Sequence, residues 1–269
     1  MLEYLVRTSH KPRPLPPGRW VMTQRWNDLL FAHWPVPPSS LTPLLPEGLQ
    51  VDTFQESAWL GVVPFWLDRI KIHGLPAIPG AHGFPELNLR TYVRDVETGT
   101  RGLYFFSTET SNLLAAVAAR TFFHLPYSWA EMRLEQKSER EFSIYSRRRM
   151  SRRPVVFQAR YRGLGPTRKS VENRSGTLEH FLMERFCLFT RNRSGHPVRA
   201  NLHHVSWPLE EAEAEIERND LAATIGIRLP DEKPVLHYSR RLALYIWPAE
   251  LVRPALAVRT APVAVAPSG

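Results

Sequence analysis

Short runs of aromatic and β-branched residues, separated by turns that contain proline or glycine, recur along most of the chain. The four strongest runs cover residues 27–35, 57–67, 84–94 and 102–109, and their composition is typical of β-strands. Weaker runs predict further strands at 129–135, 140–148, 154–162, 185–191, 197–206 and 235–247. Because helical periodicity is rare and 24 prolines interrupt the chain, strands and loops should dominate the fold.

Four segments favour helices. Residues 39–45 form a short candidate, and residues 112–123 are rich in alanine and begin at Asn112, a good capping residue. Residues 208–217 start with proline and place glutamates in the first turn, where they would interact favourably with a helix dipole. A shorter helix is expected around residues 177–185. We therefore predict an α+β fold, mainly β, in which a largely antiparallel sheet curls into a barrel with a few short helices.

The length of 269 residues fits one domain or two, and no linker divides the chain. We expect an N-terminal extension at residues 1–19, a single domain at 20–250, and a mobile tail rich in alanine, proline and valine at 251–269. No stretch approaches the ~18 apolar residues of a membrane span, and the N-terminus lacks the apolar region of a secretory signal. The single cysteine, Cys187, cannot form an intrachain disulfide. These features predict a cytoplasmic protein without membrane association.

The net charge of +9 is concentrated in one segment. Residues 133–174 contain 13 basic and 4 acidic side chains, whereas the rest of the chain is balanced at 22 of each. The Arg-rich centre of this segment, residues 145–154, is typical either of a solvated hairpin or of a surface that binds an anionic partner. No nucleic-acid-binding motif accompanies it, so nucleic acid is not the partner we expect. An interaction protein that uses this segment on an acidic partner remains the alternative function.

One predicted strand, FPELNLRTYV, carries an unusual set of polar residues. Alternation places Glu86, Asn88, Arg90 and Tyr92 on one face of it and apolar residues on the other. If this polar face lines a barrel, it offers a carboxylate, an amide and a guanidinium to a small polar ligand. If it faces water, it is the ordinary polar side of an antiparallel strand.

The remaining chemistry-bearing residues form no known motif. The sequence lacks HExxH, CxxC, GxSxG, GxGxxG and P-loop patterns, so we expect no metal and no cofactor. His203 and His204 are adjacent and would point to opposite faces of a strand. Cys187 is flanked by apolar residues, as expected of a buried structural thiol. His33 lies in an aromatic strand and is a candidate core or cavity histidine.

Several segments resemble the acetoacetate-decarboxylase-like superfamily. LTPLLPEGLQVD is similar to the helix, proline and strand that open that fold, and ARTFFHLPYSWAEM matches the spacing of a stretch that ends in Pro-Lys-Lys. Within the superfamily, HWPV, FPELNLRTYV, GLYFFSTE, LPYSWAEM and FLMERFCLF are close to the YqjF-like family, domain of unknown function 2071. The resemblance covers roughly residues 20–247.

The resemblance implies a β-barrel whose interior holds a small carbonyl or carboxylate compound. In the decarboxylases the first lysine of the pair forms a Schiff base with a keto acid, but here Tyr127 and Ser128 occupy those positions and neither can form an imine. Decarboxylation is therefore not expected. Glu86 falls on the position of the family's acid, and Arg25 falls on that of an arginine that holds the substrate carboxylate.

These considerations define a candidate site. We predict Glu86 and Tyr127 as catalytic residues, the first as base or orienter and the second as hydrogen-bond donor. The predicted ligand-binding residues are Arg25, His33, Asn88, Arg90 and Ser128. The expected partner is a small organic anion or carbonyl compound, with a homo-oligomer left open. Whether acid–base catalysis accompanies binding is not decided by the sequence.

Overall fold

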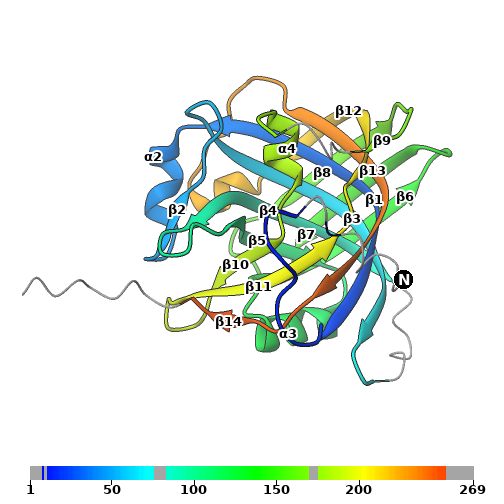
Figure 1. The fold of residues 1–269 in the computed structure, drawn as a ribbon. Helices are drawn as coiled ribbons and strands as arrows, with labels where there is room; N and C mark the ends of the chain where they lie inside the picture. Colours follow the sequence, from blue (N-terminus) through cyan, green and yellow to red (C-terminus); the bar gives the residue numbers. More distant parts are fainter. Residues whose placement is uncertain (1–7, 9–10, 76–82, 170–174, 253–269) are drawn as a thin grey trace, which may run out of the picture.

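The computed structural model describes residue 8 and residues 11–75, 83–169 and 175–252, and β-strands make up most of them (Figure 1). The strands are β1 (Met22–Val36), β2 (Leu49–Val51), β3 (Ala58–Ile72), β4 (Phe84–Asp95), β5 (Arg101–Thr110), β6 (Tyr127–Gln136), β7 (Glu141–Arg148), β8 (Val156–Gly163), β9 (Arg168–Lys169), β10 (Cys187–Arg191), β11 (Pro197–His204), β12 (Pro208–Asn219), β13 (Val235–Ile246) and β14 (Glu250–Leu251). The helical elements are α2 (Pro38–Leu41), η1 (Thr42–Leu44), α3 (Leu113–Phe122), α4 (Leu178–Met183) and η2 (Ala222–Ile225). All ten predicted strands and three of the four predicted helices are present.

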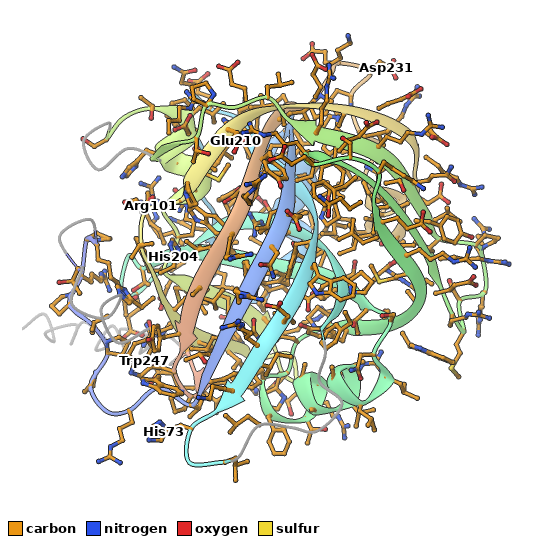
Figure 2. All side chains as sticks on the ribbon, turned by 90° about the vertical axis from the view of Figure 1, so that its right-hand side faces the viewer. His73, Arg101, His204, Glu210, Asp231 and Trp247 are labelled. Atoms are coloured by element: carbon orange, nitrogen blue, oxygen red, sulfur yellow. The ribbon has the colours of Figure 1, made fainter. Side chains whose placement is uncertain are left out.

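The strands close into two rings that share a wall. Nine strands form one closed barrel, in the order β1, β3, β4, β5, β6, β7, β8, β12 and β13. A second ring leaves β5 through β10 and returns through β11 to β13, so it comprises seven strands. Strands β13, β1, β3, β4 and β5 belong to both rings. Figure 2 shows β13, β1 and β3 side by side, with the green strands β6–β8 on one side of them and Arg101 and His204 on the other.

Because the shared wall separates two interiors, both faces of its strand β4 are buried. The first ten residues of β4, 84–93, are all buried, and Arg94 is the first exposed one. One core cluster fills the seven-strand ring and includes Phe31, Phe65 and Tyr92. The other fills the nine-strand ring and includes Leu87, which points away from that first cluster. Strand β4 therefore has no solvent face on which its polar side chains could be hydrated, whereas Arg240 and Arg241 of β13 are exposed.

The shared strands change partners along their length. Strand β5 pairs in parallel with β10 at Leu103 and Tyr104, and in parallel with β6 from Thr108 onward. Between these pairings Phe106 is an extra residue relative to β4, because Leu89 faces Ser107 while the next residue of β4 faces Phe105. Such a bulge bends a strand and increases its twist. The sheet forks at this point.

The predicted helix at 208–217 is wrong, because these residues form strand β12. Its glutamates are exposed at every second position, Glu211, Glu213, Glu215 and Glu217, and the residues between them pack on the core. This alternation is the period of a β-strand with one solvent-exposed face. The initial proline and the acidic first turn favoured a helix, but the register with β8 sets Glu213 opposite an arginine.

The same pairing neutralises much of the basic segment 133–174. Arg162 is paired with Glu213 at 2.6 Å, and Arg160 with Glu217 at 3.4 Å. Eight basic side chains of this segment have an acidic partner within ion-pair distance. The positive charge counted along the sequence is thus largely compensated in space.

The described residues extend beyond both ends of the predicted domain 20–250. Residues 11–19 lie against the barrel, where Lys11 Nζ donates to the Leu202 carbonyl and Gly18 O accepts from the Trp247 indole. Residues 1–7, 9–10 and 253–269 of the predicted extension and tail lie outside the described residues. In the described part of the chain, no helix is long and apolar enough to cross a membrane.

Gly61 permits a close approach between β3 and its neighbours in the polar row of the shared wall. A Cβ at this position would lie 2.9 Å from the His33 ring and 3.5 Å from Arg90 Cγ. Gly61→Ala should therefore lower the free energy of unfolding by about 1–3 kcal/mol in urea melts, as expected of overpacking. In a His33→Ala background the ring is absent, so the same change should cost less. An equal cost in both backgrounds would contradict this explanation.

Candidate functional site

The polar face of β4 points into the seven-strand ring, so the interior interpretation is confirmed and the solvent-facing alternative is wrong. Glu86, Asn88 and Arg90 are 5%, 1% and 2% exposed. Register places Arg90 opposite Gly61, and Gly61 opposite His33. These residues therefore form a polar row across β4, β3 and β1.

Arg90 is a buried cation without a carboxylate partner among the described residues. Its guanidinium lies 5.5 Å from the centre of the Phe31 ring, and its Nε has no hydrogen-bond partner. Burial lowers the pKa of Arg90, and the adjacent Tyr92 hydroxyl opposes that shift. An uncompensated buried charge is costly, which makes Arg90 the least satisfied group of the row.

His33 is held by Tyr92. The Tyr92 hydroxyl donates to the Leu182 carbonyl at 3.1 Å and lies 2.8 Å from His33 Nε2. Since the phenol proton goes to the carbonyl, His33 Nε2 is the donor to Tyr92 and Nδ1 is left as an acceptor. Burial, followed by the Arg90 charge, lowers the pKa of His33 well below its ordinary value, so the ring is neutral. Its Nδ1 and the side-chain oxygen of Asn88 have no partner in the described structure.

Glu86 pairs with Tyr127 rather than with an arginine. The Tyr127 hydroxyl donates to Glu86 Oε2 at 2.9 Å, and both side chains are buried. Burial raises the pKa of Glu86 to about 8, and only the Tyr127 hydrogen bond opposes this shift. The pKa of Tyr127 is in turn raised well above 10 by burial and by Glu86. At neutral pH the pair is therefore uncharged, and it cannot compensate Arg90.

Two of the predicted ligand-binding residues lie apart from this row. Arg25 is near the other end of β1 from His33, where its Nε donates to Asp68 at 2.7 Å and its Nη2 also contacts that carboxylate. Ser128 is half-buried at the start of β6. The structure brings together Glu86 and Tyr127, and separately His33, Asn88 and Arg90 along the same face.

Two cavities adjoin the row on its α4 side. The inner cavity has a volume of about 20 Å³, room for about one water molecule, and its lining includes Trp26, Arg90, Arg185 and Trp207. The outer cavity has a volume of about 540 Å³. Arg185 lines both of them.

Arg185 is a site residue that the sequence analysis missed. It is 4% exposed, lies 4.3 Å from the Phe181 ring, and donates to Asp52 Oδ2 at 2.7 Å, while its Nη2 has no partner. Asp52 also accepts from Arg101, and these two arginines hold its pKa below the ordinary value despite burial. One carboxylate is thus shared by two guanidinium groups. Arg185 lies just after α4, far from β4 in the sequence, so alternation could not connect it to the site.

The lining of the outer cavity contains more basic than acidic side chains, and Glu184 is its one acidic residue among those described. Its basic residues are Lys11, Arg13, Arg101, His180 and Arg185. Lys11 Nζ lies 5.0 Å from the centre of the Phe186 ring, and burial lowers the pKa of this amine to about 8. The described residues contain no group of three His, Cys, Asp or Glu side chains that could hold a metal ion.

The arrangement of strands is shared with solved structures of one class. An acetoacetate decarboxylase-like enzyme from Sphingomonas wittichii RW1 superposes with a TM-score of 0.61 at 14% identity, covering 89% of this chain and 98% of that one. The enduracididine biosynthesis enzyme MppR, complexed with pyruvate, superposes with a TM-score of 0.58 at 10% identity, covering 91% and 94%. The chain therefore has the acetoacetate-decarboxylase-like fold.

Comparison of the sequence assigns the chain to one family within this fold. A model of DUF2071, described as an uncharacterised conserved protein, matches residues 23–243, and the chain belongs to this family. The uncharacterised protein YqjF of Bacillus subtilis (strain 168) is 41% identical over 242 residues, which cover 90% of this chain and 97% of YqjF. Both resemblances expected from the sequence motifs are confirmed.

The buried Glu86 carboxyl should make stability depend on pH. Its pKa is about 8 in the folded protein, against an ordinary value of 4.5. Between these pH values the unfolded chain loses the proton first, so the folded state loses stability as pH rises, by at most about 1.4 kcal/mol per pH unit. Glu86→Gln cannot ionise, so its unfolding free energy relative to wild type should increase from pH 5 to pH 8.

Denaturant melts across this range measure the difference, and the exposed Glu97→Gln variant is the control. A constant difference between Glu86→Gln and wild type would show that Glu86 is already ionised in the folded protein.

Proposed function

We propose that this protein binds a small organic anion, most simply a carboxylate, inside its seven-strand ring. The observation that carries the proposal is Arg90, a fully buried guanidinium without a carboxylate partner in the described structure. A bound anion would supply the missing negative charge. Its two oxygens would match the planar donors of a guanidinium.

The second cation of the proposed site is Arg185. Arg90 and Arg185 line the same inner cavity, and each has one nitrogen without a partner. Asp52 is shared between Arg185 and Arg101, so positive charge exceeds negative charge around this cavity. Two guanidinium groups that converge on one cavity favour an anion over a neutral carbonyl compound.

The outer cavity provides room for the body of the ligand and a route inward. Its volume of about 540 Å³ lies within the range of about 300–1,000 Å³ typical of small-molecule sites. The inner cavity holds only about one water, so Arg185 and the end of α4 have to move outward when the anion reaches Arg90. The contacts to be rearranged include the hydrogen bond from the Trp207 indole to Met183 O and that from Arg185 Nε to Phe181 O.

The uncharged members of the row would then orient the ligand. Asn88 and His33 each carry an atom without a partner, and both atoms are acceptors suited to a ligand hydroxyl or to water. Glu86 and Tyr127 remain our candidates for acid–base catalysis, because a carboxyl that stays protonated up to pH about 8 can donate a proton at neutral pH. Arg25 and Ser128 are not part of this proposed site.

The structural neighbour MppR supports the choice of ligand class. It has been solved complexed with pyruvate, which is a small carboxylate. The alternative, in which the basic segment 133–174 binds an acidic macromolecule, has less support because many of its arginines are already paired with glutamates.

Arg90→Met tests the proposed anion site. Acetate, pyruvate and acetoacetate are added to the full chain, and the melting temperature is measured. A carboxylate at a hundred times its Kd should stabilise the wild-type protein by about 2.7 kcal/mol. The Arg90→Met variant should fold, since it replaces an unpaired buried charge by an apolar chain, and should lose the ligand-induced shift.

The matched control is Arg94→Gln, which removes an exposed arginine from the same strand and should keep the shift. Stabilisation of Arg90→Met equal to that of wild type, or no stabilisation of wild type by any of the three carboxylates, would contradict the proposal.

Lys11 provides an independent test of access to the outer cavity. Because its pKa is about 8, a larger fraction of this amine is neutral at pH 8 than of an ordinary lysine amine. Treatment with acetoacetate and borohydride should therefore modify Lys11 ahead of the exposed Lys71 and Lys233, and should leave no adduct at residues 119–132. Peptide mapping by mass spectrometry measures the order. Preferential labelling of the exposed lysines would show that keto acids do not reach the Lys11 amine.

A further inference from the structure

A separate cleft lies where the sheet forks at Phe106. Strand β5 leaves β10 after Tyr104 and joins β6 at Thr108, so the two neighbouring strands diverge on either side of the bulge. The opening has a volume of about 720 Å³. It is lined by parts of β5, β6 and β10, by the end of α3 and by the residues around η1. We call it the fork cleft.

The fork cleft is lined by four arginines and one histidine. Arg120, Arg148, Arg191, Arg193 and His124 line it, and no aspartate or glutamate does. Arg148 is already engaged, because it contacts Glu109 at 2.8 Å. The other three arginines have no acidic partner among the described residues, and Arg191 and Arg193 are exposed. The cleft therefore offers uncompensated guanidinium groups to a ligand.

The walls that carry these groups are tied in place. Arg120 Nε donates to the Tyr127 carbonyl at 2.6 Å, which fixes the end of α3 to β6. The Thr190 hydroxyl donates to the His124 carbonyl at 2.8 Å, which fixes β10 to the loop after α3. Asn192 accepts from two backbone N–H groups of the turn that carries Arg193. Ordered walls reduce the entropic cost of placing several cations on one ligand.

The floor of the cleft contains a polar atom that lacks a partner. Ser107 is 5% exposed and lines the cleft, and its hydroxyl has no hydrogen bond in the described structure. The lining also includes the apolar residues Leu44, Leu45, Phe106 and Ile225. The site thus combines several guanidinium groups, a buried hydroxyl and an apolar wall.

From this combination we infer that the fork cleft binds a phosphorylated small molecule with an apolar or aromatic moiety, of about nucleotide size. A phosphate group has enough oxygens and charge to engage more than one guanidinium, and arginine forks match it bidentately. The volume fits an occupant of this size. The fork cleft shares no lining residue with the inner cavity at Arg90, although Tyr127, whose hydroxyl donates to Glu86, also lines the fork cleft.

Titration calorimetry of the full chain with AMP, pyrophosphate and adenosine tests the inference. AMP should bind, adenosine should bind at least about tenfold more weakly because it lacks the phosphate, and pyrophosphate should compete with AMP. The double variant Arg191→Gln/Arg193→Gln should weaken AMP binding by about tenfold or more. Both side chains are exposed, so folding should be retained, and melting temperatures check this.

The control is Arg152→Gln/Arg153→Gln, which removes the same charge from an exposed turn outside the cleft and should change AMP affinity less than about twofold. Equal weakening in both double variants, equal binding of adenosine and AMP, or no saturable AMP binding would overturn the inference. Arg90→Met should bind AMP normally, and Arg191→Gln/Arg193→Gln should keep the carboxylate-induced shift. The two proposed sites can therefore be tested, and contradicted, independently of each other.

Discussion

Because the five-strand wall separates two rings, no side chain of residues 29–34, 58–65 or 84–93 in β1, β3 and β4 reaches bulk water. Apolar residues meet this condition on both faces, as Leu87 and Phe65 do. Polar residues meet it only by finding partners inside the protein, because an unpaired buried polar group costs about 1–3 kcal/mol. Glu86 satisfies the condition through Tyr127 and a raised pKa, and His33 through Tyr92 and a lowered one. Arg90 does not satisfy it, since a guanidinium stays charged and the nearest carboxyl on its strand is neutral. The site follows from this imbalance rather than from a conspicuous open pocket.

Because the wall belongs to both rings, each of its edge strands must pair with a neighbouring strand in each ring. Strand β13 meets this requirement by pairing with β12 near Ser239 and with β11 near Tyr245, and β5 does so by pairing with β6 and β10. At such a fork the backbone groups of one strand can no longer be satisfied by a single neighbour, and the extra residue Phe106 absorbs the change. The fork also leaves space that side chains do not fill. The geometry that closes the second ring therefore produces the cleft beside β5.

The sequence predicted the strands well because their aromatic and branched runs report burial directly, and it predicted the polar face of β4 because alternation fixes which side chains share a side. It failed at 208–217, where glutamates at every second position were interpreted as a helix first turn. The same spacing is that of a strand, and the ion pairs with Arg160 and Arg162 of β8 favour the strand over the helix.

The sequence analysis also placed Arg25 in the candidate site and omitted Arg185. The structure pairs Arg25 with Asp68 across two strands and brings Arg185 to the wall from beyond α4. Such long-range contacts leave no local pattern in one sequence.

The distribution of charge along the sequence also differs from the distribution of unpaired charge in the folded structure. The excess of nine positive charges falls within residues 133–174, yet arginines there face the acidic strand β12 and the Glu109 and Glu131 carboxylates. Arg152 and Arg153 of this segment lack an acidic partner in the described structure but lie in an exposed turn, whereas Arg90 is buried and Arg191 and Arg193 line the fork cleft. A buried or cleft-lining cation without a partner exerts a stronger local field than a solvated one, because the surrounding protein screens it less than water does. The proposed anion-binding groups Arg90, Arg191 and Arg193 are therefore arginines that the structure leaves without a glutamate, and they do not lie where arginines are most frequent along the chain.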